Sequence, residues 1–182
     1  MSAIDASKAF DRINHQKLIS KLIQRQLPTC FLNIFVNWYS KLYSCVRWNG
    51  VLSSCFKVLC GVRQGGILSP ILFNIYVNDL IDSLRVTNVG CSICNVFMGC
   101  IMYADDLILI SPTVGGLQSM LTVCSLPITV TLSTLFLMQR SVCSCVLANI
   151  TLAAGISVFI DNVALTKVTL FKYLGVLLQI EN

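Results

Sequence analysis

Residues 96–110, VFMGCIMYADDLILI, decide the fold because two apolar arms flank the adjacent carboxylates Asp105 and Asp106. Continuous apolar runs of this length are typical of strands buried on both faces, so the stretch predicts a hairpin within a buried sheet. Two like charges at a tight turn between buried strands are costly unless a cation neutralises them. An exposed polar turn is the alternative, but such turns usually contain Gly or Asn, which are absent here. The stretch therefore favours a hard metal ion such as Mg²⁺, held by oxygen ligands.

A third carboxylate, Asp5, follows Ala3 and Ile4 at the end of another strand-like segment. If this strand lies beside the hairpin, three carboxylates converge on one point. Two divalent ions held about 3.5–4 Å apart by such a cluster activate a hydroxyl and stabilise a leaving pyrophosphate. The pattern points to nucleotidyl transfer, which explains a carboxylate-rich site without histidine.

The first third of the chain predicts two helices. Asn14 is expected to cap a helix that runs to Leu27 and stops at Pro28. Thr29 is expected to cap a second helix that runs to about Tyr43. Each helix carries an apolar stripe, which predicts that both pack into a core.

The next part of the chain predicts a hairpin, a loop and a third helix. Asn49-Gly50 lies between short β-prone runs, and it favours a hairpin because both central positions need positive φ. Paired glycines predict a loop over 62–66. Ser69 and Pro70 then supply an N-cap and a first-turn proline for the third helix.

The composition is strongly apolar for a chain of 182 residues: 55% is hydrophobic, 12% is charged, and the mean hydropathy is +0.78. These values exclude a disordered chain and a collagen-like one. The uncharged runs 86–104, 107–139 and 141–160 are long enough to cross a bilayer, but polar residues, glycines and prolines interrupt them. A buried sheet is the preferred interpretation, and 141–160 stays a membrane candidate. The N-terminus lacks the apolar core of a signal peptide, so we expect an intracellular protein, nuclear or cytoplasmic.

Two further features of the sequence are its uneven distribution of charge and its cysteines. Residues 1–63 hold nine basic and two acidic side chains. This excess of positive charge can indicate a polyanionic partner or simply solvated helix faces, and the charge alone favours neither interpretation. Ten cysteines without a secretory signal predict reduced thiols. A zinc site built from Cys91, Cys94, Cys143 and Cys145 is a weaker alternative, because the gap is long and no histidine accompanies them.

Four ordered motifs resemble reverse transcriptases. They are AIDASKAFDR at 3–12, GVRQGGILSP at 61–70, YADD at 103–106 and FKYLGV at 171–176. Their order and spacing are similar to those of non-LTR (LINE-type) retrotransposons, and they extend from Asp5 to Val176. The resemblance implies an RNA-directed DNA polymerase, a nucleotidyltransferase that extends a primer 3′-hydroxyl.

The implied fold class is α+β: a right-hand polymerase palm, with an antiparallel sheet and helices packed on one face. The chain begins four residues before Asp5 and shows no thumb motif after Gly175. We therefore expect the fingers and thumb to be largely missing. Residues 1–182 are expected to form a single partial domain that ends in a primer-grip hairpin at about 159–180, and the chain alone is expected to have little activity.

The resemblance also assigns roles to individual residues. Asp5, Asp105 and Asp106 match the catalytic, metal-binding aspartates, which implies two Mg²⁺ ions, with Mn²⁺ as a substitute. Phe10, Gln64, Gly65 and Tyr103 match nucleotide-binding positions, and Phe10 the aromatic that excludes a 2′-hydroxyl. Phe171, Lys172, Tyr173, Leu174 and Gly175 match the primer grip. The implied partners are an RNA or DNA template with its primer and deoxynucleoside triphosphates; no membrane is expected, and the sequence identifies no protein partner.

One segment departs from the family pattern. Residues 126–140 are apolar where the family usually has an Asn and a Lys-containing pair, and Arg140 does not readily release a proton. We hypothesise that this segment comes from a shifted reading frame or a decayed element copy. The hypothesis fails if neither alternative frame of the coding DNA encodes a polar, Lys-containing segment there.

Two other interpretations stay open. The first is an inactive nucleic-acid-binding remnant that uses the basic first third together with Trp38, Tyr39 and Trp48. The second is an apolar, membrane-associated or aggregation-prone product of a decayed reading frame. Salt-dependent binding without catalysis favours the first, and partition into detergent without nucleic-acid binding favours the second.

Overall fold

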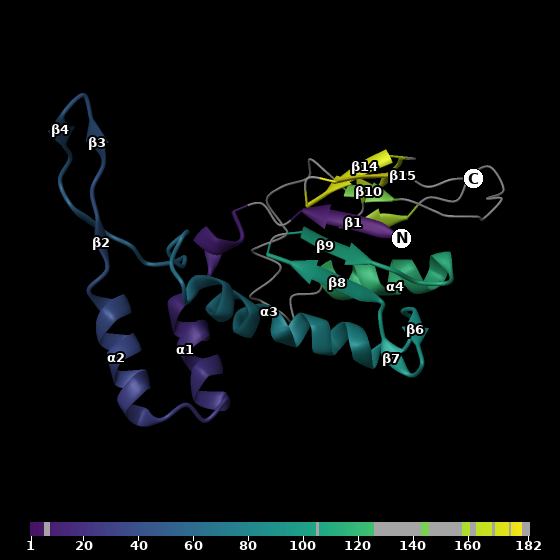
Figure 1. Cartoon of the computed structure of the whole chain (residues 1–182), viewed down its shortest axis with the longest axis horizontal. Helices are drawn as coiled ribbons and strands as arrows, with labels where there is room; N and C mark the ends of the chain where they lie inside the picture. The colour runs from purple at the N-terminus through teal and green to yellow at the C-terminus, as the bar shows by residue number, and fades with distance from the viewer. Residues whose placement is uncertain are drawn as a thin grey trace. The chain divides into compact units, whose positions relative to one another are not determined.

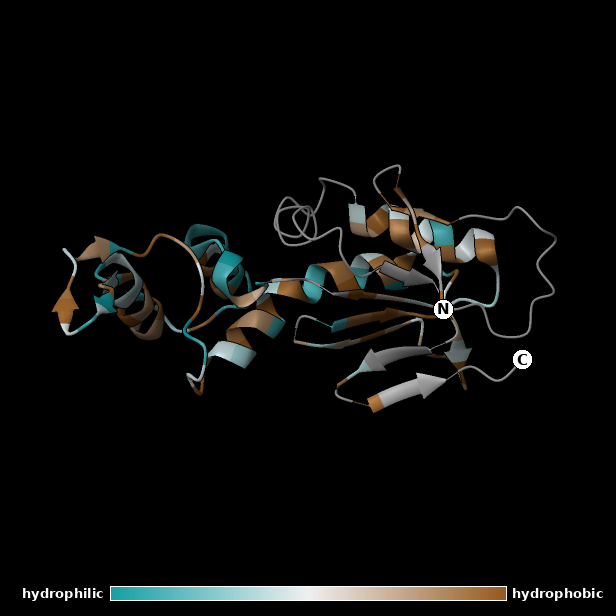
Figure 2. Cartoon of the chain, turned by 90° about the horizontal axis from the view of Figure 1, so that it is seen from above, coloured by the Kyte–Doolittle hydropathy of each residue, from teal (hydrophilic) through white to brown (hydrophobic). Residues whose placement is uncertain are grey.

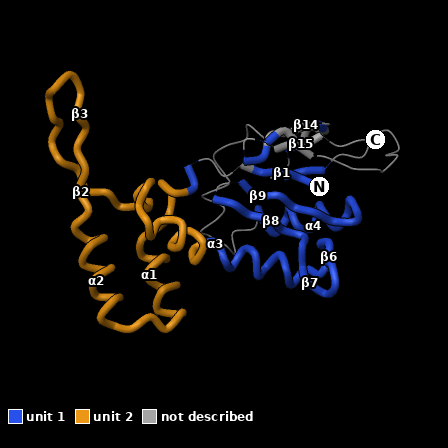
Figure 3. The backbone as a smooth tube through the Cα atoms, in the orientation of Figure 1, with its two compact units in different colours: residues 1–9, 77–182 blue, residues 10–76 orange. Residues whose placement is uncertain are grey.

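A computed structural model describes most of the chain (Figure 1). The described residues are 1–5, 8–104, 106–125, 143–145, 158–160, 163–168, 170–174 and 176–179. The hypothesised frameshift segment 126–140 and most of the membrane candidate 141–160 lie outside them. The chain divides into two compact units: unit 1 comprises residues 1–9 and 77–182, and unit 2 comprises residues 10–76 (Figure 3).

A five-stranded sheet forms the centre of unit 1, with strand order β13-β10-β1-β9-β8. The strands are β1 (Ser2–Asp5), β8 (Cys100–Tyr103), β9 (Asp106–Leu109), β10 (Cys143–Cys145) and β13 (Thr166–Lys167). The pairs β1–β9, β8–β9 and β1–β10 are antiparallel, whereas β10–β13 is parallel. The expectation of an antiparallel sheet is therefore correct for three of these pairs and wrong at the β13 edge.

The two faces of the sheet are covered differently. Leu107 and Leu109 of β9 are buried on one face and Ile108 on the other, because successive side chains alternate along a strand. Figures 1 and 2 show α4 (Val114–Ser125) along one face and the hairpin β14–β15 on the opposite side. Ile108 packs against Ala3, Val168 and Tyr173 on that opposite side. The α4 helix, which the sequence analysis did not predict, buries Leu117, Met120, Leu121 and Cys124.

The described part of unit 1 also contains three short hairpins. They are β6 (Ser92–Ile93) with β7 (Val96–Phe97), β11 (Phe159–Ile160) with β12 (Val163–Ala164), and β14 (Leu170–Tyr173) with β15 (Val176–Gln179). The apolar arm predicted over 96–103 is thus two strands, broken where Gly99 closely approaches Gly90. The single hairpin expected at about 159–180 is likewise two hairpins. Gln118 of α4 holds the first of them, because its side-chain amide bonds both the N–H and the carbonyl of Phe159 at 2.8 Å.

Unit 2 begins with the 3-10 helix η1 (Phe10–Arg12), followed by α1 (His15–Gln24) and α2 (Thr29–Ser40). The Asn14 cap is confirmed, because its side-chain oxygen accepts the Lys17 N–H at 3.0 Å. The Thr29 cap is wrong: Pro28 occupies the N-cap position of α2, where no side chain caps the helix. A proline there already fixes an extended entry into the helix, so Thr29 becomes the first helical residue.

Two paired strand segments follow α2, β2 (Tyr43–Ser44) with β5 (Phe56–Lys57) and β3 (Arg47–Trp48) with β4 (Val51–Leu52). The turn between β3 and β4 is confirmed, with φ of +48° at Asn49 and +79° at Gly50. The helix α3 (Ser69–Val86) then runs from unit 2 into unit 1. Its buried side chains include Phe73, Leu80 and Leu84.

The two helices of unit 2 differ in burial. Helix α1 buries Leu18 and Leu22 as predicted, but α2 buries no residue at all. Its exposed apolar side chains include Phe31, at 55% exposure, and Trp38, at 46%. The expectation that the second helix packs into a core is met only in part, because Leu32 and Phe35 on its apolar stripe are half-buried rather than buried. The strongly hydrophobic residues of β4 in unit 2 are exposed (Figure 2).

In the part of the chain that the structure describes, no helix combines the length and hydropathy needed to cross a bilayer. The described cysteines Cys30, Cys45, Cys55, Cys60, Cys91, Cys94, Cys100 and Cys124 are all free thiols. Burial raises the pKa of Cys100 to about 11, so this thiol stays protonated near neutral pH.

Candidate active site

The sheet of unit 1 brings two of the predicted aspartates side by side. In the antiparallel pair β1–β9, Asp5 lies directly opposite Asp106, and Tyr103 lies opposite Asp106 across the hairpin β8–β9. The sequence analysis required the strand that ends at Asp5 to lie beside the hairpin, and the register places it there. The Asp106 side chain is half-buried, whereas the Asp5 side chain and the whole of Asp105 lie outside the described residues.

The turn that carries the aspartates is strained. Tyr103 pairs with Asp106, so only residues 104 and 105 connect the two strands. Ala104 adopts φ of +51°, a left-handed conformation that costs a residue with a Cβ about 1–2 kcal/mol. Because this turn has no Gly or Asn that would adopt positive φ easily, Ala104 adopts it at the cost of backbone strain. Such strain concentrates at functional sites, where paired strands hold it in place.

Tyr173 lies on the face of the sheet opposite α4, packed against Ile108. Its hydroxyl oxygen is buried and has no hydrogen-bond partner within the described ranges. Burial raises the pKa of Tyr173, and the Asp106 carboxylate and Cys100 raise it further. The phenol therefore stays protonated at neutral pH, within electrostatic reach of Asp106, with a donor left over for a ligand.

The other predicted primer-grip residues are less fully described. Leu174 is exposed and adopts φ of +50° in the turn between β14 and β15. Phe171 and Lys172 lie on β14, but their side chains are outside the described part of the chain, as is Gly175. Tyr103, a predicted nucleotide-binding residue, is 64% exposed at the end of β8.

Unit 2 joins the other predicted nucleotide-binding residues through one loop. The Val62 N–H donates to the Phe10 carbonyl at 2.8 Å, and the Gly61 N–H donates to the Ile13 carbonyl at 2.7 Å. The Gln64 side-chain amide donates to an Asp11 carboxylate oxygen at 3.4 Å. These bonds fasten the start of the 61–66 loop to the segment that carries Phe10.

Phe10 itself is half-buried. Its ring stacks on Phe73 of α3, with the centroids 4.8 Å apart and an angle of 21° between the planes. Gly65 adopts φ of +79°, and a Cβ added there would meet nothing within 4 Å. No other part of the described chain therefore crowds the backbone at Gly65.

Two residues that support this loop were missed by the sequence analysis. His15 is buried, and its Nε2 lies 2.7 Å from the Gly61 carbonyl oxygen, to which it donates. Asp11 accepts the hydrogen bond from Gln64. The signal available in the sequence was weak: a lone histidine and a second acidic residue shortly after Asp5.

The expected Ser69 cap is also corrected. The Ser69 hydroxyl donates to the Arg63 carbonyl, and the Gly66 N–H donates to the same oxygen at 3.1 Å. The hydroxyl is therefore used to close the loop rather than to accept a helix N–H. This bond ties the loop to the start of α3.

The described side chains include no cluster of three or more His, Cys, Asp or Glu residues that could hold a metal ion. The zinc alternative therefore gains no support at Cys91 and Cys94, while the side chains of Cys143 and Cys145 lie outside the description. The pairing of Asp5 with Asp106 is a backbone observation, which sets these two residues opposite each other on neighbouring strands.

Comparison with known proteins agrees with the motifs. The profile of the family described as "Reverse transcriptase (RNA-dependent DNA polymerase)" matches residues 1–129. The chain is 34% identical over 118 residues to a retrovirus-related Pol polyprotein from the type-2 retrotransposable element R2DM of Drosophila melanogaster, covering 65% of this chain and 11% of that protein.

Two further relatives are similar in kind. A Pol polyprotein from the R2 element of Nasonia vitripennis is 30% identical over 67% of this chain and 12% of its own length. An RNA-directed DNA polymerase from the mobile element jockey of Drosophila funebris is 33% identical over 57% of this chain and 11% of its own. The chain thus spans a small part of the relatives that it matches. Because the family profile covers well over half of the chain, this protein belongs to the reverse transcriptase family, among relatives from R2 and other non-LTR retrotransposons.

Proposed function

We propose that this chain is the catalytic segment of an RNA-directed DNA polymerase encoded by a non-LTR retrotransposon. The register that sets Asp5 opposite Asp106 carries the proposal, because it brings residues of two sequence motifs together on neighbouring strands. The reaction is attack of a primer 3′-hydroxyl on a deoxynucleoside triphosphate, directed by an RNA or DNA template. We place this chemistry inside the cell, in the nucleus or the cytoplasm.

The architecture that we propose for unit 1 is a polymerase palm. A helix covers one face of the sheet, and Ile108, Ala3 and Tyr173 pack on the other face. Asp106 lies two residues before Ile108 on the same strand, so it shares that second face. This arrangement supports a palm because Asp106 and the hairpin that carries Tyr173 share the face opposite the helix, which stabilises the sheet from behind.

The residues present fit a divalent metal site. Asp5, Asp105 and Asp106 would supply oxygen ligands, the donors that Mg²⁺ and Mn²⁺ prefer. The register that sets Asp5 opposite Asp106 supports the fit, because it places two of these residues next to each other in the sheet. When bound, two such ions would lower the pKa of the attacking hydroxyl and offset the charge of the leaving pyrophosphate.

The remaining residues position the substrates in this proposal. Phe10 would contact the sugar of the incoming nucleotide and disfavour a 2′-hydroxyl, while Gln64, Gly65 and Tyr103 would contact the nucleotide and its template base. Residues 171–175 would hold the primer end. The bonds that fasten Val62 and Gln64 to residues 10–11 support a shared role for these two segments.

The test is RNA-templated primer extension. Residues 1–129 replace the matching segment of the R2 relative from Drosophila melanogaster, and incorporation of deoxynucleotides is measured with that relative as the reference. We expect template-directed incorporation that requires a divalent ion and discriminates against ribonucleotides. A fusion protein with the circular dichroism spectrum of the reference that binds primed RNA but incorporates no nucleotide would contradict the proposal.

A further inference from the structure

Unit 2 contains a two-stranded ribbon, residues 42–58, that carries two exposed cysteines (Figure 1). At the base of the ribbon β2 pairs with β5, and Ser44 lies opposite Phe56. Cys45 comes directly after β2, and Cys55 comes directly before β5. Continuing this antiparallel register by one residue therefore places the two cysteines opposite each other on neighbouring strands.

The hydrogen bonds of the ribbon bring this pair close together. The Val58 N–H donates to the Leu42 carbonyl at 2.9 Å, so Leu42 and Val58 occupy a hydrogen-bonded position of the antiparallel pair. Such positions alternate with non-hydrogen-bonded ones, and Cys45 and Cys55 fall on one of the latter. Cα atoms at non-hydrogen-bonded positions are about 4.5 Å apart, within the range of about 4.4–6.8 Å that disulfides span.

The strands are also joined on the other side of the pair, toward the tip of the ribbon. The Ser53 N–H donates to the Val46 carbonyl at 2.9 Å, and the Ser53 hydroxyl oxygen accepts the Val46 N–H at 2.9 Å. Between these bonds and the β2–β5 pairing, one strand contributes Cys45 and the other contributes Ser54 and Cys55. This two-against-one count is that of a β-bulge. Hydrogen bonds therefore hold the two strands together on each side of the cysteines.

The two thiols are accessible to a charged reagent. Both are free and exposed. Residues 41–57 contain the basic side chains Lys41, Arg47 and Lys57 and no acidic residue. Because a positive field attracts anions, an anionic low-molecular-weight disulfide such as oxidised glutathione suits this surface as an oxidant.

We propose that Cys45 and Cys55 are a redox-sensitive pair, which a low-molecular-weight disulfide converts reversibly into a cross-strand disulfide. The thiolate of one cysteine attacks a sulfur of the small disulfide, which forms a mixed disulfide and releases one small thiolate. The thiolate of the other cysteine attacks the protein sulfur of this mixed disulfide, which forms the cross-strand bond and releases the second small thiolate. Two protein thiols are oxidised, the small disulfide is reduced to two thiols, and these take up the two protons. Exposed disulfides are among the labile ones, so excess reduced glutathione reverses the reaction.

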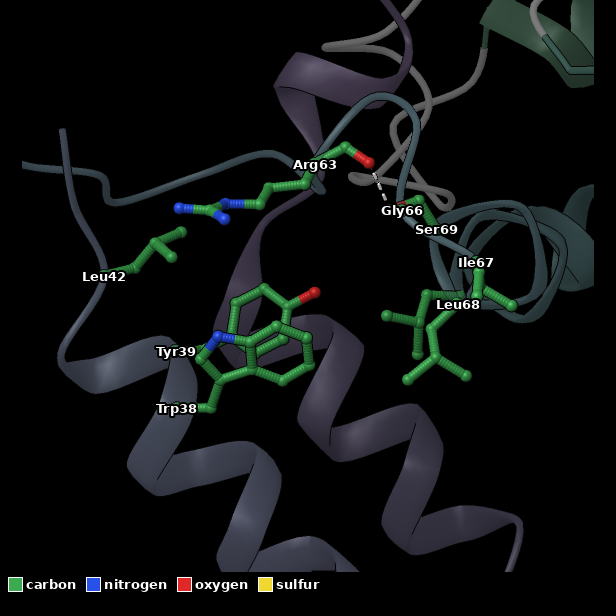
Figure 4. A pocket seen from close by; sticks show the side chains of 9 residues that line it. Trp38, Tyr39, Leu42, Arg63, Gly66, Ile67, Leu68 and Ser69 are labelled. Carbon is green, nitrogen blue, oxygen red and sulfur yellow. Dashed lines mark hydrogen bonds between the residues drawn. The ribbon is translucent and has the colours of Figure 1, made fainter.

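The cross-link acts next to the walls of two cavities in unit 2. A cavity of about 520 Å³ is lined by the base of the ribbon, at Leu42, Ser44 and Val58, and by Gln64. Figure 4 shows Leu42 at the edge of a second cavity, of about 390 Å³. Oxidation adds a covalent clamp beyond this base, so it restricts the separation of β2 from β5. The cross-link does not require polymerase activity, so its test is independent of the proposed function.

The test maps the disulfides of the full chain after equilibration with mixtures of oxidised and reduced glutathione. The remaining thiols are alkylated, and the protein is digested with trypsin. Cleavage after Lys and Arg places Cys45 in peptide 42–47 and Cys55 in peptide 48–57. Each peptide contains a single cysteine, so a linked pair of these peptides, identified by its mass, reports the cross-link directly.

We expect peptide 48–57 to be linked to 42–47 about tenfold more often than to 58–63, because a preset neighbour has the higher effective concentration. Peptide 58–63 carries Cys60, which is the matched control within the chain. Cys60 is exposed and closer to Cys55 in sequence than Cys45 is, but the structure sets it opposite Asn14. In the Cys45→Ser protein, Cys55 should carry glutathione as a mixed disulfide instead.

An equal mixture of isotope-labelled and unlabelled protein separates bonds within one chain from bonds between chains. We expect both peptides of a linked pair to be labelled or both to be unlabelled. Random combination of labelled with unlabelled peptides would overturn the proposal. It would also be overturned if peptide 48–57 linked equally to 42–47 and 58–63, or if it formed no link to 42–47 in the most oxidising mixture.

Discussion

Asp5→Asn and Asp105→Asn, each introduced into the 1–129 fusion protein, are expected to lower primer extension about a thousandfold. Each substitution keeps the size of the side chain and removes one negative charge from the proposed metal site. Loss of several kcal/mol of transition-state stabilisation corresponds to a decrease of that order. Initial rates of deoxynucleotide incorporation on primed RNA, at saturating Mg²⁺, give the measurement.

A double variant that combines Asp5→Asn with Asp105→Asn tests whether the two residues hold the same metal ions. If Asp5 and Asp105 hold the same ions, removing both should cost little more than removing one, because residues that act as a unit are not additive. Asp82→Asn on α3 is the matched control: Asp82 is an exposed carboxylate, 3.4 Å from Arg85, and should leave the rate unchanged. The shared site would be contradicted if the double variant lost primer extension by the product of the two single losses. It would also be contradicted if either single variant extended primers as fast as Asp82→Asn.

Gly61→Ala is expected to destabilise unit 2 by about 3 kcal/mol. Gly61 adopts φ of +91°, and a Cβ there would lie 2.9 Å from both the Cα and the carbonyl oxygen of Asp11. Neither is the end of a flexible side chain, so the backbone itself has to move. The same movement would disturb the bonds from Gly61 to Ile13 and from His15 to Gly61.

Comparison with Gly50→Ala separates the destabilisation caused by the clash with Asp11 from the destabilisation caused by positive φ alone. Gly50 also has positive φ, +79°, but a Cβ there meets nothing within 4 Å, so the loss should be about 1 kcal/mol. Urea unfolding followed by tryptophan fluorescence reports on unit 2, because both tryptophans lie within residues 10–76. Equal losses in the two variants would show that the close approach to Asp11 does not matter.

The parts of the fold that the sequence predicted are those with a local physical signal. The apolar arms around Asp105 and Asp106 predicted the hairpin, and the Asn49-Gly50 pair predicted a turn with positive φ. The Asn14 N-cap was also predicted from a local signal, and its hydrogen bond to the Lys17 N–H confirms it. The pairing of Asp5 with Asp106 was only conditional in the sequence, because strand neighbours are set by tertiary contacts that no short pattern encodes.

Other elements were missed or misread because tertiary context overrode the local pattern. Glycines interrupt the uncharged run 107–139, and no helix was predicted there, yet α4 forms because Leu117, Met120 and Leu121 can be buried along one side. The apolar stripe of α2 predicted core packing, but its residues are at most half-buried. Ser69 matched the pattern of a cap, and its hydroxyl instead donates to Arg63.

Binding of Mn²⁺ to the full 182-residue chain, followed by the electron paramagnetic resonance signal of the free ion, tests the central claim most directly. Mn²⁺ takes the oxygen ligands that Mg²⁺ takes, and the measurement does not depend on catalysis. The proposed site predicts that the wild-type chain and Asp82→Asn bind Mn²⁺ alike, and that Asp5→Asn and Asp105→Asn each bind it much more weakly. Equal Mn²⁺ binding by all four proteins would contradict the assignment of the metal site to these aspartates.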